Sequence, residues 1–74
     1  MRTKEEQDFL LKFGLRLREI RTKKGWTLEF VEEKGWEHWQ YLQQIETGKK
    51  DIGLLTLKKL SQLYRIPISD FFKK

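Results

Sequence analysis

Residues 27–48 read TLEFVEEKGWEHWQYLQQIETG, and this stretch decides the fold of the chain. Thr27 is a favourable N-terminal cap, so a helix is predicted over about 28–34, and Gly35 breaks it. A second helix is predicted over about 38–46, because apolar residues recur there at helical spacing before Gly48. Its apolar positions are Tyr41, Leu42 and Ile45. Two helices joined by a tight turn within about twenty residues have the dimensions of a helix-turn-helix.

The flanking sequence predicts three further helices around this pair. Thr3 and Glu6 form a capping box that opens a long helix over about 4–24, and Gly25 suits its C-terminal end. Two more helices are expected over about 54–64 and 68–72, the last one opened by Pro67. The positions expected to face the core are Phe9, Leu10, Phe13, Leu17 and Ile20, and then Leu54, Leu57, Leu60 and Tyr64. No segment alternates as a strand would, so the predicted fold class is all-α, a compact five-helix domain spanning 1–74.

Charge and composition narrow the range of partners. The 74 residues contain 16 Lys+Arg and 11 Asp+Glu, a net charge of +5 that favours a polyanionic partner, nucleic acid or an acidic membrane surface. The absence of cysteine excludes disulfides and thiolate metal sites, and a single histidine cannot form a metal site alone. Because no apolar run is long enough to span a bilayer and no signal-peptide pattern occurs, we expect a cytoplasmic protein.

The sequence offers no set of residues for catalysis. It contains no histidine–carboxylate–nucleophile set, no glycine-rich phosphate loop and no cluster of metal ligands. We therefore expect no enzymatic activity, no cofactor and no small-molecule ligand.

From Phe13 to Phe72 the chain resembles the lambda-repressor-like, Xre-type family of helix-turn-helix domains. Three segments carry this resemblance: LREIRTKKGWT (17–27), YLQQIETGKK (41–50) and TLKKLSQLYRIPISDFF (56–72). It implies a sequence-specific regulator of transcription that binds double-stranded DNA, with the helix over 38–46 in the major groove. A protein-interaction module, such as an antitoxin-like partner whose DNA binding is secondary, is the main alternative, and binding to an anionic membrane is another.

The resemblance also implies roles for particular residues. Trp39, Gln40 and Gln44 match positions that reach base edges, whereas Thr27, His38, Lys49 and Lys50 match positions that contact phosphates. Arg21 and Glu46 match a structural ion pair between the first helix and the end of the recognition helix. The chemistry agrees, because glutamine can bind adenine with two hydrogen bonds, and lysines in a loop attract phosphate without reading sequence.

The sequence departs from the family pattern in the turn and in the helix before it. Gly35 stands one place before the usual turn glycine and Trp36 occupies its place, so an altered turn is expected. Glu32 replaces a small residue, so we expect the two motif helices to cross more widely. Trp39 can also be interpreted as a core residue that packs on Trp36. The glutamines can also be interpreted as ordinary solvated helix residues.

We also expect a symmetric homodimer on a two-fold-related operator, because one recognition helix reads too few base pairs to single out a site. The predicted dimer seam is Ile68, Phe71 and Phe72, near Ile66 in the last nine residues. In the alternative, both phenylalanine rings fold back onto the first helix, against Phe13 and Leu17.

Overall fold

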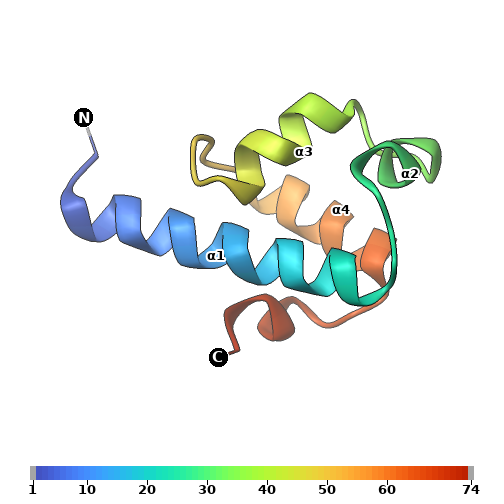
Figure 1. Ribbon diagram of the computed structural model, residues 1–74. Coiled ribbons are helices and arrows are strands. Elements are labelled where there is room, and N and C mark those ends of the chain that lie inside the picture. The colour runs from blue at the N-terminus through green and yellow to red at the C-terminus, as the bar shows by residue number, and fades with distance from the viewer. Residues whose placement is uncertain (1, 74) are drawn as a thin grey trace.

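The computed structural model describes residues 2–73, which form four α-helices and one short 3-10 helix (Figure 1). Their bounds are α1 Lys4–Lys23, α2 Leu28–Glu33, α3 Trp39–Glu46, α4 Leu54–Tyr64 and η1 Ile68–Phe72. No strand occurs within these described residues, which confirms the all-α class. The expectation of five helices is corrected at its last element, since five residues after Pro67 form only a tight 3-10 turn.

The predicted starts of α1 and α2 are confirmed by their hydrogen bonds. The Thr3 hydroxyl accepts the Glu6 N–H at 3.1 Å, and the Glu6 carboxylate accepts the Thr3 N–H at 2.8 Å. The Thr27 hydroxyl likewise accepts the Phe30 N–H at 3.0 Å. Each cap satisfies backbone donors that have no partner within the first turn, so these helices begin where the sequence predicts.

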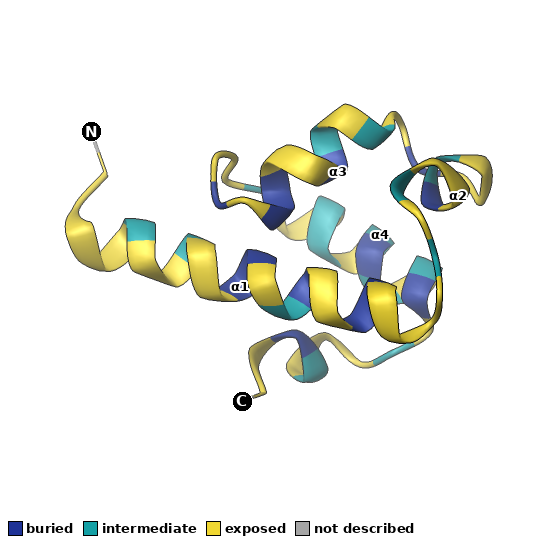
Figure 2. Cartoon of the chain, viewed as in Figure 1, coloured by how far each residue is buried: buried dark blue, intermediate teal, exposed yellow. Residues whose placement is uncertain are grey.

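The core lies between α1 and the other helices. In Figure 1, α1 crosses the front of the molecule, α3 lies above it, α4 behind it and η1 below it. Figure 2 shows the buried positions on the surfaces that these elements turn toward one another. The buried apolar residues are Phe13, Leu17, Ile20, Val31, Trp36, Leu42, Ile45, Leu60, Tyr64 and Phe71.

Two residues that were expected in the core are exposed. Phe9 is 57% exposed and Leu54 is 77% exposed, although both fall on the predicted apolar face of their helix. Helical periodicity identifies a face, but it does not show where along the helix the packing partner ends. The first turns of α1 extend beyond the layer formed by the other helices (Figure 1), and Leu54 is the first residue of α4.

Phe71 is not available for the predicted dimer seam. It is only 1% exposed, and its ring packs on Phe13 at 5.8 Å and on Tyr64 at 6.4 Å between centroids. Phe72 also contacts Phe13, at 5.5 Å, but remains 49% exposed, and Ile68 is 37% exposed. The 3-10 turn points adjacent side chains in different directions, so one ring enters the core and the other lies over its edge.

A glycine sets the contact between α1 and α3. A Cβ atom on Gly14 would lie 2.4 Å from the carbonyl oxygen of Glu46 and 2.5 Å from that of Ile45. Those atoms are backbone and cannot move aside cheaply, so only glycine lets the two helices approach this closely. Gly14 therefore fixes the C-terminal end of α3 against α1.

Candidate nucleic-acid interface

Helix α3 has one buried face and one polar face. Leu42 and Ile45 are 0% and 1% exposed and anchor the helix in the core. The outer positions are all exposed, and they are Gln40, Gln43 and Gln44. Because three and four residues separate neighbours on a helix surface, these amides form one continuous polar surface.

The cap of α3 leaves a hydrogen-bond donor directed outward. His38 is the N-cap, and its Nδ1 accepts the backbone N–H of Tyr41 at 3.2 Å. A ring nitrogen that accepts a hydrogen bond carries no proton, so in the neutral ring the proton is on Nε2. The exposed His38 ring therefore presents an N–H to solvent at the start of α3.

A second acceptor at the start of α3 comes from α2. The Glu32 carboxylate accepts the backbone N–H of Trp39 at 2.9 Å. The sequence identified Glu32 only as an obstacle to close helix crossing, whereas here its side chain joins the two motif helices. No local pattern predicts this contact, since it depends on how α2 and α3 are placed in space. It also leaves a negative charge beside the polar surface of α3.

Trp36 enters the core through the turn between α2 and α3. Gly35 has φ 125°, a conformation that side chains rarely adopt, and it turns the chain so that Trp36 is only 4% exposed. The Trp36 ring stacks on Tyr41, with 5.5 Å between the ring centroids. Trp39 is half-buried, so part of its ring remains accessible.

The loop after α3 carries two exposed lysines, and its backbone is hydrogen-bonded to residues near the start of the chain. Gly48 has φ 77° and closes α3, and Lys49 and Lys50 follow it on the surface. The Gln7 amide donates to the Gly48 carbonyl at 2.9 Å, and an Arg2 N–H donates to the Lys49 carbonyl at 3.4 Å. Arg2, just before α1, and Gln7, in its first turn, therefore fix the backbone of this loop. Helical periodicity reveals neither contact.

A buried ion pair joins α1 to the end of α3. Arg21 Nε and Nη2 donate to the two Glu46 carboxylate oxygens at 2.7 and 3.0 Å, and Nη1 donates to the Trp26 carbonyl at 2.8 Å. Arg21 is 8% exposed and Glu46 is 5% exposed. The hydrogen bond to Glu46 raises the pKa of Arg21, so the guanidinium stays charged in the interior.

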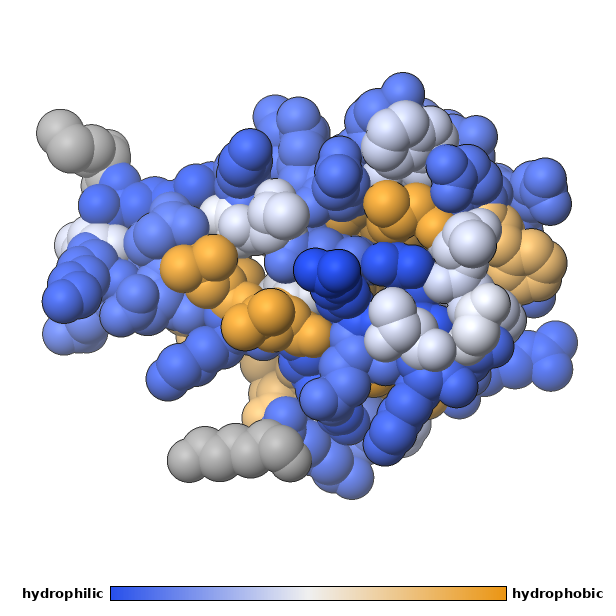
Figure 3. Space-filling model, in the orientation of Figure 1, coloured by the Kyte–Doolittle hydropathy of each residue, from blue (hydrophilic) through white to orange (hydrophobic). Residues whose placement is uncertain are grey.

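The structure thus places most of the predicted contact residues at the surface. Those exposed are Thr27, His38, Gln40, Gln44, Lys49 and Lys50. The surface over α3 is mostly hydrophilic (Figure 3). Within residues 2–73 no helix is long and apolar enough to cross a membrane, and no three metal-ligating side chains gather.

These features define a class of protein. A short capped helix, a tight turn and a second helix with a buried and a polar face form a helix-turn-helix, here fixed to a supporting first helix.

Comparison with known proteins gives the family. Residues 17–71 match the model of the helix-turn-helix family, and the chain belongs to this family, in its Xre, lambda-repressor-like form. No curated protein sequence gives a significant match.

Two solved structures are similar over most of their length. The DNA-binding domain of BldD is 28% identical, with a TM-score of 0.83 over 88% of this chain and 94% of that one. The restriction-modification controller protein C.AhdI from Aeromonas hydrophila is 33% identical, with a TM-score of 0.80 over 88% and 98%.

Proposed function

We propose that this chain is a sequence-specific regulator of transcription that binds double-stranded DNA through α3 and has no enzymatic activity. The observation that carries the proposal is the division of α3 into an anchored apolar face and an exposed row of amides. Its similarity to a DNA-binding domain and to a controller protein supports the same function.

In this proposal α3 lies in the major groove and reads bases directly. Gln40 and Gln44 lie one turn apart, so each can present its amide to a different base pair, adenine being the preferred partner. The accessible edge of Trp39 adds an apolar contact, for which a thymine methyl group is suited.

The remaining contacts position the domain on the DNA backbone. The hydroxyl hydrogen of Thr27 and the Nε2–H of His38 can each donate to a phosphate, because their acceptor atoms already bind the helix backbone. Lys49 and Lys50 add positive charge on a fixed loop. We further propose that two copies bind a two-fold-related operator, which doubles the readout.

Single substitutions separate base reading from phosphate binding. Gln44→Ala should lower affinity for the selected operator by ~1–3 kcal/mol and relax preference at one base position. Lys50→Ala should weaken binding to all sequences about equally and reduce the salt dependence by about 0.9 in the slope of log affinity against log salt. Operator selection from a random duplex pool, followed by titration at several salt concentrations, measures both effects.

Matched controls lie on α4. Gln62 and Lys58 are exposed, so Gln62→Ala and Lys58→Ala remove the same groups away from α3 and should change nothing. Weak, salt-insensitive binding to every duplex would instead favour the protein-interaction alternative.

A further inference from the structure

We propose that the exposed surface formed by Lys24, Trp26 and Lys34 binds phosphates of the DNA backbone at the end of α3 opposite the loop that carries Lys49 and Lys50. We term this surface the lysine–tryptophan site. The inference deepens the proposed function, on which it rests, because it assigns charged contacts to the second of the two strands that border the groove.

An aromatic ring brings two ammonium groups together at this surface. Lys24 is the C-cap of α1, and Lys34 is the C-cap of α2. The Nζ of Lys24 lies 5.1 Å from the centroid of the Trp26 ring, and the Nζ of Lys34 lies 4.9 Å from it. The negative face of the indole attracts both cations, so two long and otherwise flexible side chains are gathered at one place.

Trp26 is fixed relative to α3. Its backbone carbonyl accepts a hydrogen bond from Arg21 Nη1 at 2.8 Å, and its backbone N–H donates to the Arg21 carbonyl at 3.2 Å. The Trp26 ring packs on Tyr64 in the core, with 5.6 Å between the ring centroids. Since Arg21 also binds Glu46 at the end of α3, one guanidinium positions both the ring and the helix that is proposed to enter the groove.

The two lysines carry charge that the protein does not neutralise. Both are exposed, and within residues 2–73 no carboxylate forms a salt bridge with either ammonium group. The two nitrogens are at most about twice as far from each other as each is from the ring, so their like charges repel. A DNA strand carries one phosphate every ~3.4 Å along its axis, and neighbouring phosphates would relieve this repulsion.

The site lies at the α2 end of the proposed interface. In Figure 1, α2 and the loop after α3 lie at opposite ends of α3. Two sugar–phosphate strands border the major groove, so groups at the two ends of an inserted helix can each meet a different strand. Trp26 directly precedes Thr27, whose hydroxyl is proposed to contact a phosphate. Lys24 and Lys34 therefore adjoin a backbone contact that the proposed function already includes.

These lysines supply positive charge that α2 itself lacks. Helix α2 contains no basic residue, and it carries Glu29, Glu32 and Glu33. Carboxylates on this side of the interface repel a polyanion unless cations offset them. Lys24 and Lys34 provide that offset where the backbone would pass.

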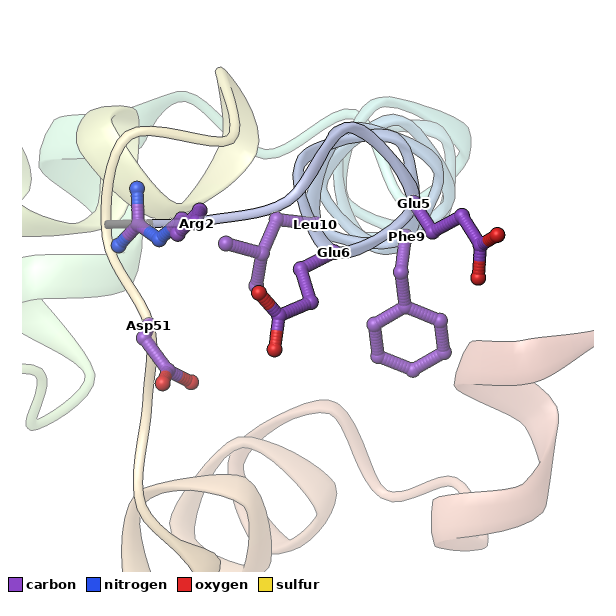
Figure 4. Close-up of a pocket in the computed structure, with 6 residues that line it drawn as sticks. All are labelled: Arg2, Glu5, Glu6, Phe9, Leu10 and Asp51. Atoms are coloured by element: carbon purple, nitrogen blue, oxygen red, sulfur yellow. The ribbon is translucent and has the colours of Figure 1, made fainter.

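The pocket beside the loop after α3 is less suited to phosphates. It lies between this loop and the first turns of α1, where three acids face a single base (Figure 4). The acids are Glu5, Glu6 and Asp51, and the base is Arg2. This excess of carboxylates disfavours a polyanion, so additional phosphates fit better at the lysine–tryptophan site.

Salt titration of operator binding counts the contacted phosphates. Lys24→Gln and Lys34→Gln should each reduce the slope of log affinity against log salt by about 0.9, and the double variant should reduce it by about 1.8. Lys58→Gln is the control, because it removes an equal charge from an exposed position on α4 and should leave the slope unchanged.

Two substitutions of Trp26 test the role of the ring. Trp26→Phe keeps an aromatic face and should keep most of the wild-type slope, whereas Trp26→Leu keeps only apolar bulk and should lose part of it. Thermal unfolding of both variants checks that each remains folded at the temperature of the titration, because Trp26 also packs on Tyr64. Equal slopes in the two variants would contradict the role of the ring.

Neutral methylphosphonate linkages, introduced one at a time into the operator, locate the phosphates. A linkage that weakens binding of the wild type but not of the Lys24→Gln/Lys34→Gln double variant marks a contact of the site. These linkages should lie on the strand opposite the one that the same scan assigns to Lys50.

An unchanged salt slope in the double variant would overturn the inference and would favour an acidic protein segment as the partner of this surface. The proposed DNA binding would still stand in that case if the wild type showed a steep salt dependence. A wild type that binds no duplex would refute both, so the two failures are distinguishable.

Discussion

The guanidinium of Arg21 makes three hydrogen bonds in the interior, two to Glu46 and one to the Trp26 carbonyl. Arg21→Ala or Glu46→Ala strands the opposite charge away from water, so each should lower the free energy of unfolding by ~3–5 kcal/mol. Urea and thermal unfolding measure the loss. This loss in the free energy of unfolding should exceed any direct loss in the free energy of DNA binding caused by either substitution.

The double variant Arg21→Met/Glu46→Leu is the control for that prediction. It removes both charges and leaves apolar side chains of similar length, so its loss of stability should be smaller than that of either single change. An unchanged melting temperature in the single variants would show that the pair is solvated rather than buried.

Tyr64 gives the protein a specific alkaline sensitivity. Burial raises the pKa of Tyr64 above its ordinary value of 10.0, and its hydroxyl has no hydrogen-bond partner in the described residues. Above pH 10 the unfolded chain loses this proton while the folded one keeps it, so stability is complete below that pH and falls as pH rises. Above pH 10 the Tyr64→Phe variant should lose less stability than the wild type. At pH 7 the free energies of unfolding of the two proteins should differ by less than ~1 kcal/mol.

Unfolding curves of the wild type and of Tyr64→Phe, measured from pH 7 to 11, test this prediction. The two proteins differ only at position 64, so the difference between their two curves reports on the Tyr64 hydroxyl. Parallel curves would show that the Tyr64 hydroxyl reaches water.

Residue-level prediction from the sequence succeeds where the cause is local. The Thr3–Glu6 box and the Thr27 cap need only side chains within one helical turn, and both are confirmed. The burial of Phe71 beside an exposed Phe72 could not be predicted, because it depends on the direction in which the 3-10 turn meets α1.

At the scale of elements, Glu32 determines how α2 and α3 are joined. Glu32→Gln keeps an acceptor for the Trp39 N–H but removes a negative charge beside the proposed DNA surface. Affinity should therefore rise for operator and random duplex alike, with a loss of stability below ~1 kcal/mol. Binding titrations on both duplexes at one salt concentration measure the rise.

Glu32→Ala provides the contrast, because it removes the charge and the acceptor together. A fully buried donor without a partner costs about 1–3 kcal/mol, and the Trp39 N–H is part-buried, so this variant should be less stable than Glu32→Gln by an amount toward the lower end of that range. Equal stability of the two variants would contradict a role for the hydrogen bond.

Helix positions follow from periodicity and caps, but helix contacts do not. The sequence places α3 within one residue of its observed bounds. It places Phe9 and Leu54 in the core, because periodicity carries no information on where a neighbouring helix stops. The same gap concealed the support of the loop after α3 by Gln7, whose partner Gly48 lies 41 residues away.

For the whole molecule, a fixed dimer imposes a spacing on its DNA. If two copies bind the operator as the proposed homodimer, their α3 helices meet half-sites about one helical turn apart, ~34 Å or 10–10.5 base pairs. Inserting about five base pairs between half-sites should reduce affinity to that of one half-site, because it moves one of them to the opposite face of the duplex. Gel-shift titration of operators with altered spacing measures this, and affinity that is independent of spacing would contradict a rigid dimer.

The division of α3 into two faces has a consequence for how such a protein changes over generations. Leu42 and Ile45 hold the helix, while Gln40, Gln43 and Gln44 touch solvent and contribute little to the core. Exposed substitutions usually alter stability by less than about 0.5 kcal/mol. A library randomised at these three positions should therefore remain folded almost throughout, so that new operator preferences are reached by single steps without an intervening loss of the fold.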